Sequence, residues 1–326
     1  MTGRLAALVG AAFLAAGALP AAGIADGLPV LGIDVGSKGV AARGAPVRYV
    51  TLSSGTNTIV ARTATAGGRV IRHYEIRGTF TIPAVAYDGS ADGLSADGGT
   101  LVLIEPRRAF PRARTTLAVV DARRLRVVRR VALSGDFSFD AISPHGRTLF
   151  LIQYISRQDP TRYRVRAYDL RAGTLSPKLV VDPREQEDAM RGSPLTRVSG
   201  PGGRWAYTLY DGAGGTPFVH ALDTRTRRAR CIDLPMLAGV RNLWQVRLSV
   251  DGSRIVVAGP RRTLALIDTS SFGVTTPSRA SNTVLLASEV AAALALAASL
   301  AAAAWFGLRR LRRRTGPSAT DPRPAA

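Results

Sequence analysis

The chain has 326 residues and a formal net charge of +21, from 44 Lys plus Arg against 23 Asp plus Glu. This length accommodates one large domain or two smaller ones. The single cysteine, Cys231, excludes an intrachain disulfide, so stability must come from packing. The basic excess is explained either by a solvated Arg-rich surface or by attraction to anionic lipid or an anionic envelope polymer.

Residues 1–25 have the pattern of a secretory signal peptide. Arg4 precedes an apolar run from Leu5 to Leu19, and Pro20 and several small residues follow. A basic start, an apolar centre and small residues at the end are typical of cleaved export signals. An uncleaved N-terminal anchor is the alternative. Because export removes the basic segment from the cytoplasm, we do not expect nucleic acid as a partner.

Residues 26–47 are predicted to form an extended segment that packs on the first unit of the following domain. The run Asp34-Val-Gly36-Ser37-Lys38-Gly39 is similar to the first phosphate motif of sugar kinases and actin-like ATPases. That fold requires a long α/β domain after the motif, whereas repeats with β propensity follow here. We therefore do not predict a nucleotide site.

Four similar segments divide residues 48–275 into units of about 50 residues. Each begins with Ser, places Gly in a short polar turn and continues into an apolar strand; they are residues 95–104, 143–152, 199–208 and 249–258. Their starts are 48, 56 and 50 residues apart. Gly tolerates the positive φ that tight hairpin turns require.

A second strand in each unit ends in Asp, at Asp121, Asp169, Asp223 and Asp268. A further turn and strand follow the first three. An earlier, half-matching unit covers residues 48–76, with Gly67 and Gly68 as its turn. Three or four short strands per unit of this length predict an all-β, β-propeller-like domain of about five blades over residues 48–275. The first unit lacks an obvious inner strand, so closure could pair strands from the two ends.

These Ser-Pro-Asp-Gly-like turns resemble those of bacterial propeller families related to TolB and the YVTN repeat proteins. The resemblance covers roughly residues 48–275 and implies a WD40-like propeller architecture. The Gly-His and Trp-Asp pairs of eukaryotic WD40 repeats are absent. The resemblance does not imply a particular chemistry, since one fold hosts many functions.

No residue set in the sequence predicts a catalytic, cofactor or metal site. His73, His145 and His220 fall in three different units without metal-ligand spacing, and Cys231 has no neighbouring base, so a buried core position is expected for it. The four strand-ending Asp residues are interpreted as turn formers. The acidic stretch from Asp182 to Asp188 lengthens one repeat, and it is either a solvated loop or a binding loop.

Residues 284–308 are predicted to form one transmembrane helix. The run contains a single charge, Glu289, and is long enough to cross a hydrocarbon core of about 30 Å. Arg309, Arg310 and three further Arg follow at once, which places the tail, residues 309–326, in the cytoplasm. A Leu-Pro-x-Thr-Gly sorting motif is absent before the helix, so we expect a retained single-pass anchor in the cell membrane with the repeats outside.

These features favour a non-catalytic, membrane-anchored propeller that binds or scaffolds an envelope protein or an anionic envelope polymer. One alternative is an extracytoplasmic propeller enzyme, such as a hydrolase, lactonase or oxidoreductase, with its site at the propeller axis. Another is a sensor that acts through a second membrane protein, because the tail is too short to carry an output domain. The expected partners are the lipid bilayer and that envelope component, with no cofactor.

Overall fold

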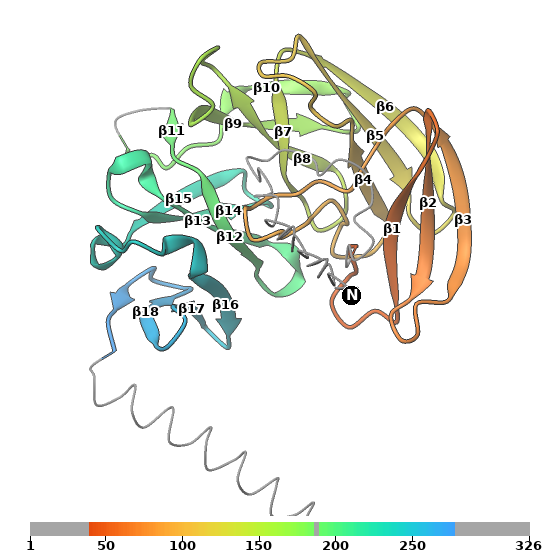
Figure 1. Ribbon diagram of the computed structural model, residues 1–326. Coiled ribbons are helices and arrows are strands. Elements are labelled where there is room, and N and C mark those ends of the chain that lie inside the picture. The colour runs from red at the N-terminus through yellow and green to blue at the C-terminus, as the bar shows by residue number, and fades with distance from the viewer. Residues whose placement is uncertain (1–38, 186–188, 278–326) are drawn as a thin grey trace, which may run out of the picture.

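The computed structural model describes residues 39–185 and 189–277 and places them in five antiparallel sheets that follow one another in chain order (Figure 1). The predicted signal peptide, most of the 26–47 segment, the predicted span 284–308 and the tail lie outside these residues. Within the described part, no helix has the length and apolarity needed to cross a membrane.

The first two sheets have three strands each and the others have four on their main path. The first sheet contains β1 (Val47–Ser54), β2 (Asn57–Ala64) and β3 (Val70–Arg77), and the second contains β4 (Thr100–Ile104), β5 (Arg114–Asp121) and β6 (Arg126–Ser134). The third contains β7 (Phe137–Ile142), β8 (Thr148–Tyr154), β9 (Arg162–Asp169) and β10 (Thr174–Leu179), with β11 (Met190–Arg191) also paired to β9.

The fourth sheet contains β12 (Pro194–Ser199), β13 (Trp205–Tyr210), β14 (Phe218–Asp223) and β15 (Arg228–Asp233). The fifth contains β16 (Arg247–Asp251), β17 (Arg254–Ala258), β18 (Thr263–Asp268) and β19 (Val274–Thr275). The helical elements of the described part are 3-10 turns of three residues: η1 (Pro201–Gly203), η2 (Gly212–Gly214), η3 (Pro235–Leu237) and η4 (Leu243–Gln245).

Each sheet is a meander in which successive strands are antiparallel neighbours, so its connections alternate between two ends. We call one end the turn face, where the first strand turns into the second and the third into the fourth. The opposite end, the loop face, carries the connections from second to third strands and from each sheet to the next. In the two three-stranded sheets, the isolated bridges Val40 to Tyr49 and Leu94 to Leu101 occupy the place of a first strand. Val40 thus pairs with the first sheet, whereas residues 26–38 of the predicted N-terminal segment lie outside the described residues.

The core lies between sheets, because each consecutive pair of sheets shares at least one cluster of buried apolar side chains, and the third and fourth share two. Examples contributed by the two sheets of each pair, in chain order, are Val60 and Leu101, Val119 and Leu149, Phe150 and Leu222, and Val219 and Val257. Burying such a side chain stabilises the fold by roughly 1.5–3 kcal/mol. Each sheet therefore depends on its sequence neighbours for most of its buried surface, as in repeat architectures.

The strand-ending aspartates form the turns that the sequence predicts. In Asp121, Asp169, Asp223 and Asp268, Oδ1 accepts hydrogen bonds from the backbone N–H groups two and three residues later, at 2.8–3.1 Å. This Asx-turn geometry closes the connection to the fourth strand of each sheet. The four carboxylates occupy separate turns, so the interpretation as turn formers is confirmed.

The predicted turn-and-strand segments are confirmed as the turns that lead into β4, β8, β13 and β17. The strands before three of those turns, β7, β12 and β16, were not predicted from the sequence. The possible pairing of strands from the two chain ends is not present among residues 39–185 and 189–277, where β1 pairs with β2 and β19 with β18.

Asp223 should stabilise the fold more than its equivalent Asp121. Its side chain is 4% exposed and also accepts two hydrogen bonds from Arg204, at 3.0 and 2.7 Å, whereas the Asp121 side chain is 21% exposed. We expect Asp223→Ala to lower the free energy of unfolding by about 1–3 kcal/mol, because it removes a buried carboxylate that accepts four hydrogen bonds, from Arg204, Arg225 and Thr226. Asp121→Ala should cost less in the same denaturant titration, and equal losses would contradict this assignment.

The Asp223 contribution should depend on pH in a defined direction. Burial raises the pKa of Asp223, but hydrogen bonds from Arg204, Arg225 and Thr226 outweigh burial and the net pKa is lowered. The stabilisation is therefore complete above the unfolded-state pKa of about 4 and is lost as the pH falls through the lower folded value. The difference between the wild type and D223A should shrink on acidification.

Candidate functional site

The interior of the molecule contains a buried ion-pair network that joins the third and fourth sheets and the segment before β4. Arg197 on β12 contacts the carboxylate of Asp140 on β7 and donates to the Asp140 backbone carbonyl at 2.6 Å. Its Nε donates to Thr208 Oγ1 at 2.8 Å, and Nη1 lies 3.5 Å from Asp92 Oδ2. The side chains of Arg197 and Asp140 are 3% and 2% exposed. Burial alone would lower the pKa of Arg197, but the two carboxylates raise it, so the guanidinium stays charged.

A second closed network lies at the start of β7. Arg107 donates to Asp136 Oδ1 at 2.8 Å and to Ser138 Oγ at 2.9 Å, and its guanidinium carbon lies 4.5 Å from the centre of the Tyr154 ring. Tyr154 contacts Tyr163, which in turn contacts Tyr210. Burial raises the pKa of the Tyr163 and Tyr210 phenols, so both are neutral. The charged groups of this region are thus paired with one another, whereas Asp140 Oδ2, Arg112 Nε and Tyr163 Oη are buried without a hydrogen-bond partner.

Two large cavities open on opposite faces. The turn-face cavity, of about 550 Å³, is lined mainly by small residues and backbone, with Arg43 and Asp92 as its ionisable groups. The loop-face cavity, of about 540 Å³, is chemically richer. It contains ionisable and sulfur-bearing side chains from the β10–β12 connection and from β14 and β15: Asp182, Arg184, Glu185, Met190, His220, Cys231 and Asp233.

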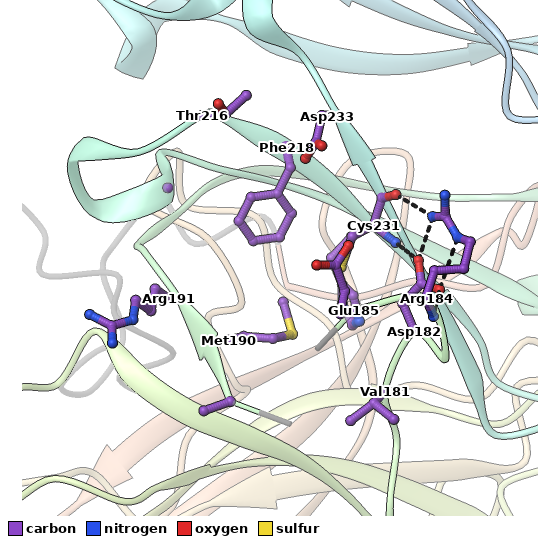
Figure 2. A pocket seen from close by; sticks show the side chains of 13 residues that line it. Val181, Asp182, Arg184, Glu185, Met190, Arg191, Thr216, Phe218, Cys231 and Asp233 are labelled. Atoms are coloured by element: carbon purple, nitrogen blue, oxygen red, sulfur yellow. Dashed lines mark hydrogen bonds and ion pairs between the residues drawn. The ribbon is translucent and has the colours of Figure 1, made fainter. Parts of the chain in front are cut away.

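Figure 2 shows how Asp182, Arg184, Glu185 and Cys231 gather on one side of the loop-face cavity. Arg184 donates to both oxygens of Asp182, from Nε at 3.1 Å and from Nη2 at 2.5 Å. The backbone N–H of Cys231 donates to Asp182 Oδ2 at 2.8 Å, and Arg184 Nη2 also donates to the Cys231 carbonyl at 2.8 Å. Asp182 therefore fixes the β10–β12 connection onto β15.

Local sequence explains these positions. Glu185 donates its backbone N–H to the Asp182 carbonyl at 3.1 Å, so the two carboxylates occupy one tight turn. Cys231 on β15 is the register partner of His220 on β14, and directly opposed residues project from the same side of a sheet. The Phe218 ring and Met190 add an apolar wall (Figure 2).

Burial controls the protonation of the two reactive groups in this cavity. Burial, followed by the nearby carboxylates of Glu185 and Asp182, raises the pKa of the Cys231 thiol to about 12. Burial lowers the pKa of His220 to about 4. At neutral pH the thiol is protonated and the imidazole is neutral.

The other residues singled out from the sequence are dispersed. His73 lies on the exposed strand β3, and His145 lies on the turn face, where Nδ1 is 3.4 Å from Asp97 Oδ2. Asp34 to Lys38 lie outside the described residues, as do Glu187 and Asp188. The expectation of a buried core position for Cys231 is wrong in part, since its residue is only half-buried at the cavity.

Sequence comparison places this chain in a family. The sequence model described as the lipoprotein LpqB beta-propeller domain matches residues 115–311, more than half of the chain. The chain belongs to the LpqB β-propeller domain family. The recognition of a bacterial β-propeller is thereby confirmed, and with it the all-β, propeller-like fold class. No curated protein matches the chain in a separate search.

Solved structures similar to this family member include several proteins of low sequence identity. Hydrazine synthase from Kuenenia stuttgartiensis is 17% identical, with a TM-score of 0.42, over 74% of this chain and 70% of that chain. TolB from Acinetobacter baumannii is 14% identical, with a TM-score of 0.38, over 72% and 52%. A puromycin-hydrolyzing peptidase from Mycobacterium tuberculosis is 19% identical, with a TM-score of 0.37, over 73% and 38%. The chain thus covers about half or less of the latter two.

The Arg197 network should be among the most sensitive polar groups of the fold. Arg197→Met removes the only charge that contacts the Asp140 carboxylate among the ion pairs of the described residues. Breaking a buried pair in this way costs roughly 3–5 kcal/mol. Arg124→Met removes an exposed pair with Asp121 and should cost at most about 1 kcal/mol. Denaturant unfolding of both variants checks this, and similar losses would contradict it.

The Cys231 thiol should react slowly with alkylating agents. The thiolate is the reactive form, so a pKa of about 12 in place of about 8.5 lowers its population at pH 7.5 roughly 3,000-fold. We expect the iodoacetamide rate of the folded chain to be reduced on that scale relative to the same chain in urea, and to increase about tenfold per pH unit. Fast alkylation of the folded chain at pH 7.5 would contradict the assignment.

Proposed function

We propose that this family member is a membrane-anchored, extracytoplasmic binding module for an anionic envelope polymer. The predicted signal peptide and the predicted span 284–308 with its following arginines support the location. The description of the family names a lipoprotein, which also supports a location in the cell envelope. The polymer binds to the outer surface of the propeller.

The observation that carries the proposal is an arginine-rich rim on the first two sheets. We call the exposed side chains of β3 and β6 the basic rim; its arginines are Arg72, Arg77, Arg126, Arg129 and Arg130. Glu75 is the only acidic residue on these two strands. Arg130 donates to the Arg77 carbonyl at 2.6 Å, so the two strands contribute to one surface. Clustered positive charge of this kind attracts polyanions and steers their approach.

The closed interior favours binding over catalysis at the axis. Arg197, Asp140, Arg107 and Asp136 are all consumed in buried ion pairs. Among the described residues, the sole thiol is protonated at neutral pH, and its register partner His220 has no hydrogen bond to activate it. A nucleophile requires such an activating base. These observations do not support the propeller-enzyme alternative.

Topology orients the domain relative to the predicted anchor. Since β19 is a fourth strand, the chain leaves its sheet at the loop face, and the predicted span begins seven residues after Pro277. The β15–β16 connection on the same face exposes Trp244 (61%), and its Met236 lines a small cavity with Thr276 and Pro277. An exposed indole suits the membrane interface. The loop face therefore approaches the bilayer, and the basic rim points sideways into the envelope.

Charge reversal on the basic rim tests the proposal. We expect the full chain, in nanodiscs of zwitterionic lipid, to bind long-chain inorganic polyphosphate in a salt-sensitive manner. The double variant R72E/R129E should weaken this binding at least about tenfold, because it replaces attraction by repulsion on one surface. Fluorescence anisotropy with labelled polyphosphate measures the affinity.

The matched control is R261E/R262E, which makes the same change in net charge on the exposed β17–β18 loop of the fifth sheet. This control should retain binding close to that of the wild type. Equal weakening by both double variants would show that only net charge matters and would contradict a role for the rim. Absence of binding by the wild type would contradict a polymer partner.

A further inference from the structure

The loop-face cavity brings together side chains whose chemistry the proposed binding function does not use. We propose that Asp182, Glu185 and Cys231 bind a zinc-type divalent cation, with His220 as a fourth ligand. The site lies away from the basic rim, on the β10–β12 connection and on β14 and β15. Binding of a cation at this site does not depend on polymer binding at the basic rim, so the two proposals can be tested separately.

The ligand atoms of the three primary ligands lie near one another without a metal. One carboxylate oxygen each from Asp182 and Glu185 and the Cys231 Sγ all lie within 4.8 Å of one another. Tetrahedral sites with metal–ligand distances of about 2.0–2.3 Å place their ligand atoms somewhat closer than this. Only small rotamer adjustments are needed, because Glu185 is exposed and its side chain is free to turn toward the others.

His220 provides a second, independent observation that points to a ligand. Its residue is 1% exposed, yet neither Nδ1 nor Nε2 has a hydrogen-bond partner. A buried imidazole without partners is costly, since burial of a polar group is normally compensated by hydrogen bonds. His220 lines the same cavity as Cys231 and is its register partner across β14 and β15. The ring nitrogens of His220 are not among the ligand atoms that lie within 4.8 Å of one another, so the imidazole reaches a metal at Cys231 only after its ring turns toward the cavity.

The ligand types select the metal. A thiolate and an imidazole favour zinc over the hard cations calcium and magnesium, which take oxygen ligands. With Cys231 as thiolate, the two carboxylates and Arg184 leave a local charge of about −2, which a divalent cation neutralises. The thiol loses its proton to solvent on binding, as metal-bound cysteines do.

Arg184 has a positioning role in this arrangement. It holds Asp182 through both carboxylate oxygens and also contacts the Cys231 carbonyl, so it fixes the spacing between two of the ligands. Both oxygens of Asp182 already accept two N–H bonds each, from Arg184 and from the Cys231 backbone, so a cation at Asp182 displaces one of these donors. Outer partners that orient metal ligands in this way are a regular part of metal sites.

Cobalt titration of the metal-stripped full chain in detergent tests the proposal. We expect one Co²⁺ per chain, with a thiolate-to-cobalt charge-transfer band and displacement by Zn²⁺. Cys231→Ser should abolish the band. Glu185→Gln should weaken Co²⁺ binding at least about tenfold, because the loss of a residue that only orients a metal ligand already weakens binding by about that factor. Since Glu185 is exposed, this second variant does not depend on a change in folding.

Asp233→Asn and His145→Gln are the matched controls. Asp233 lines the same cavity but is not among the clustered ligand atoms, and His145 lies on the turn face. Both variants should retain the cobalt spectrum and affinity, as should R72E/R129E. Substoichiometric binding, a spectrum without the thiolate band, or a band that survives C231S would overturn the site.

Discussion

The fold depends on a charge that cannot reach water. Arg197 is almost fully buried, and its guanidinium is satisfied only when β12, β7 and the segment at Asp92 hold their relative positions. Burying an unpaired charge costs several kcal/mol, so any slip between the second, third and fourth sheets is penalised electrostatically as well as by lost packing. Arg197 therefore helps to specify how the third and fourth sheets and the Asp92 segment are arranged.

Because the charged side chains of the interior are paired with one another, side chains available for binding are found on the outer faces. On the turn face, the repeated aspartates are occupied by their own backbone N–H groups, so this face is built from self-satisfied turns. The loop face carries irregular connections that differ from sheet to sheet, and the β10–β12 connection is long enough to place Asp182 against Cys231. Loops on a rigid scaffold are where function is usually located. The asymmetry between the faces follows from the strand order alone.

The sequence was sufficient to predict the second and third strands of most sheets, because Gly-containing turns and terminal aspartates delimit them. It did not reveal β7 and β12, since Asp140 and Arg197 interrupt the apolar pattern by which strands are recognised. Cys231, His220 and the acidic stretch were each noticed separately. Their convergence depends on the β14–β15 register and on the turn at Asp182, which are long-range features that spacing does not encode.

The two proposed sites are compatible because they occupy different parts of the domain surface. The basic rim lies on the outer strands of the first two sheets, whereas the cavity lies on the loop face of the third and fourth. If the anchor follows β19 as predicted, the cavity faces the bilayer, where diffusing macromolecules have little access but ions exchange freely. A cation there suits a role in fixing the β10–β12 connection, while polymer recognition requires the laterally exposed rim. The proposed cation site in the loop-face cavity is thus separate from the basic rim, which is the proposed surface for polymer binding.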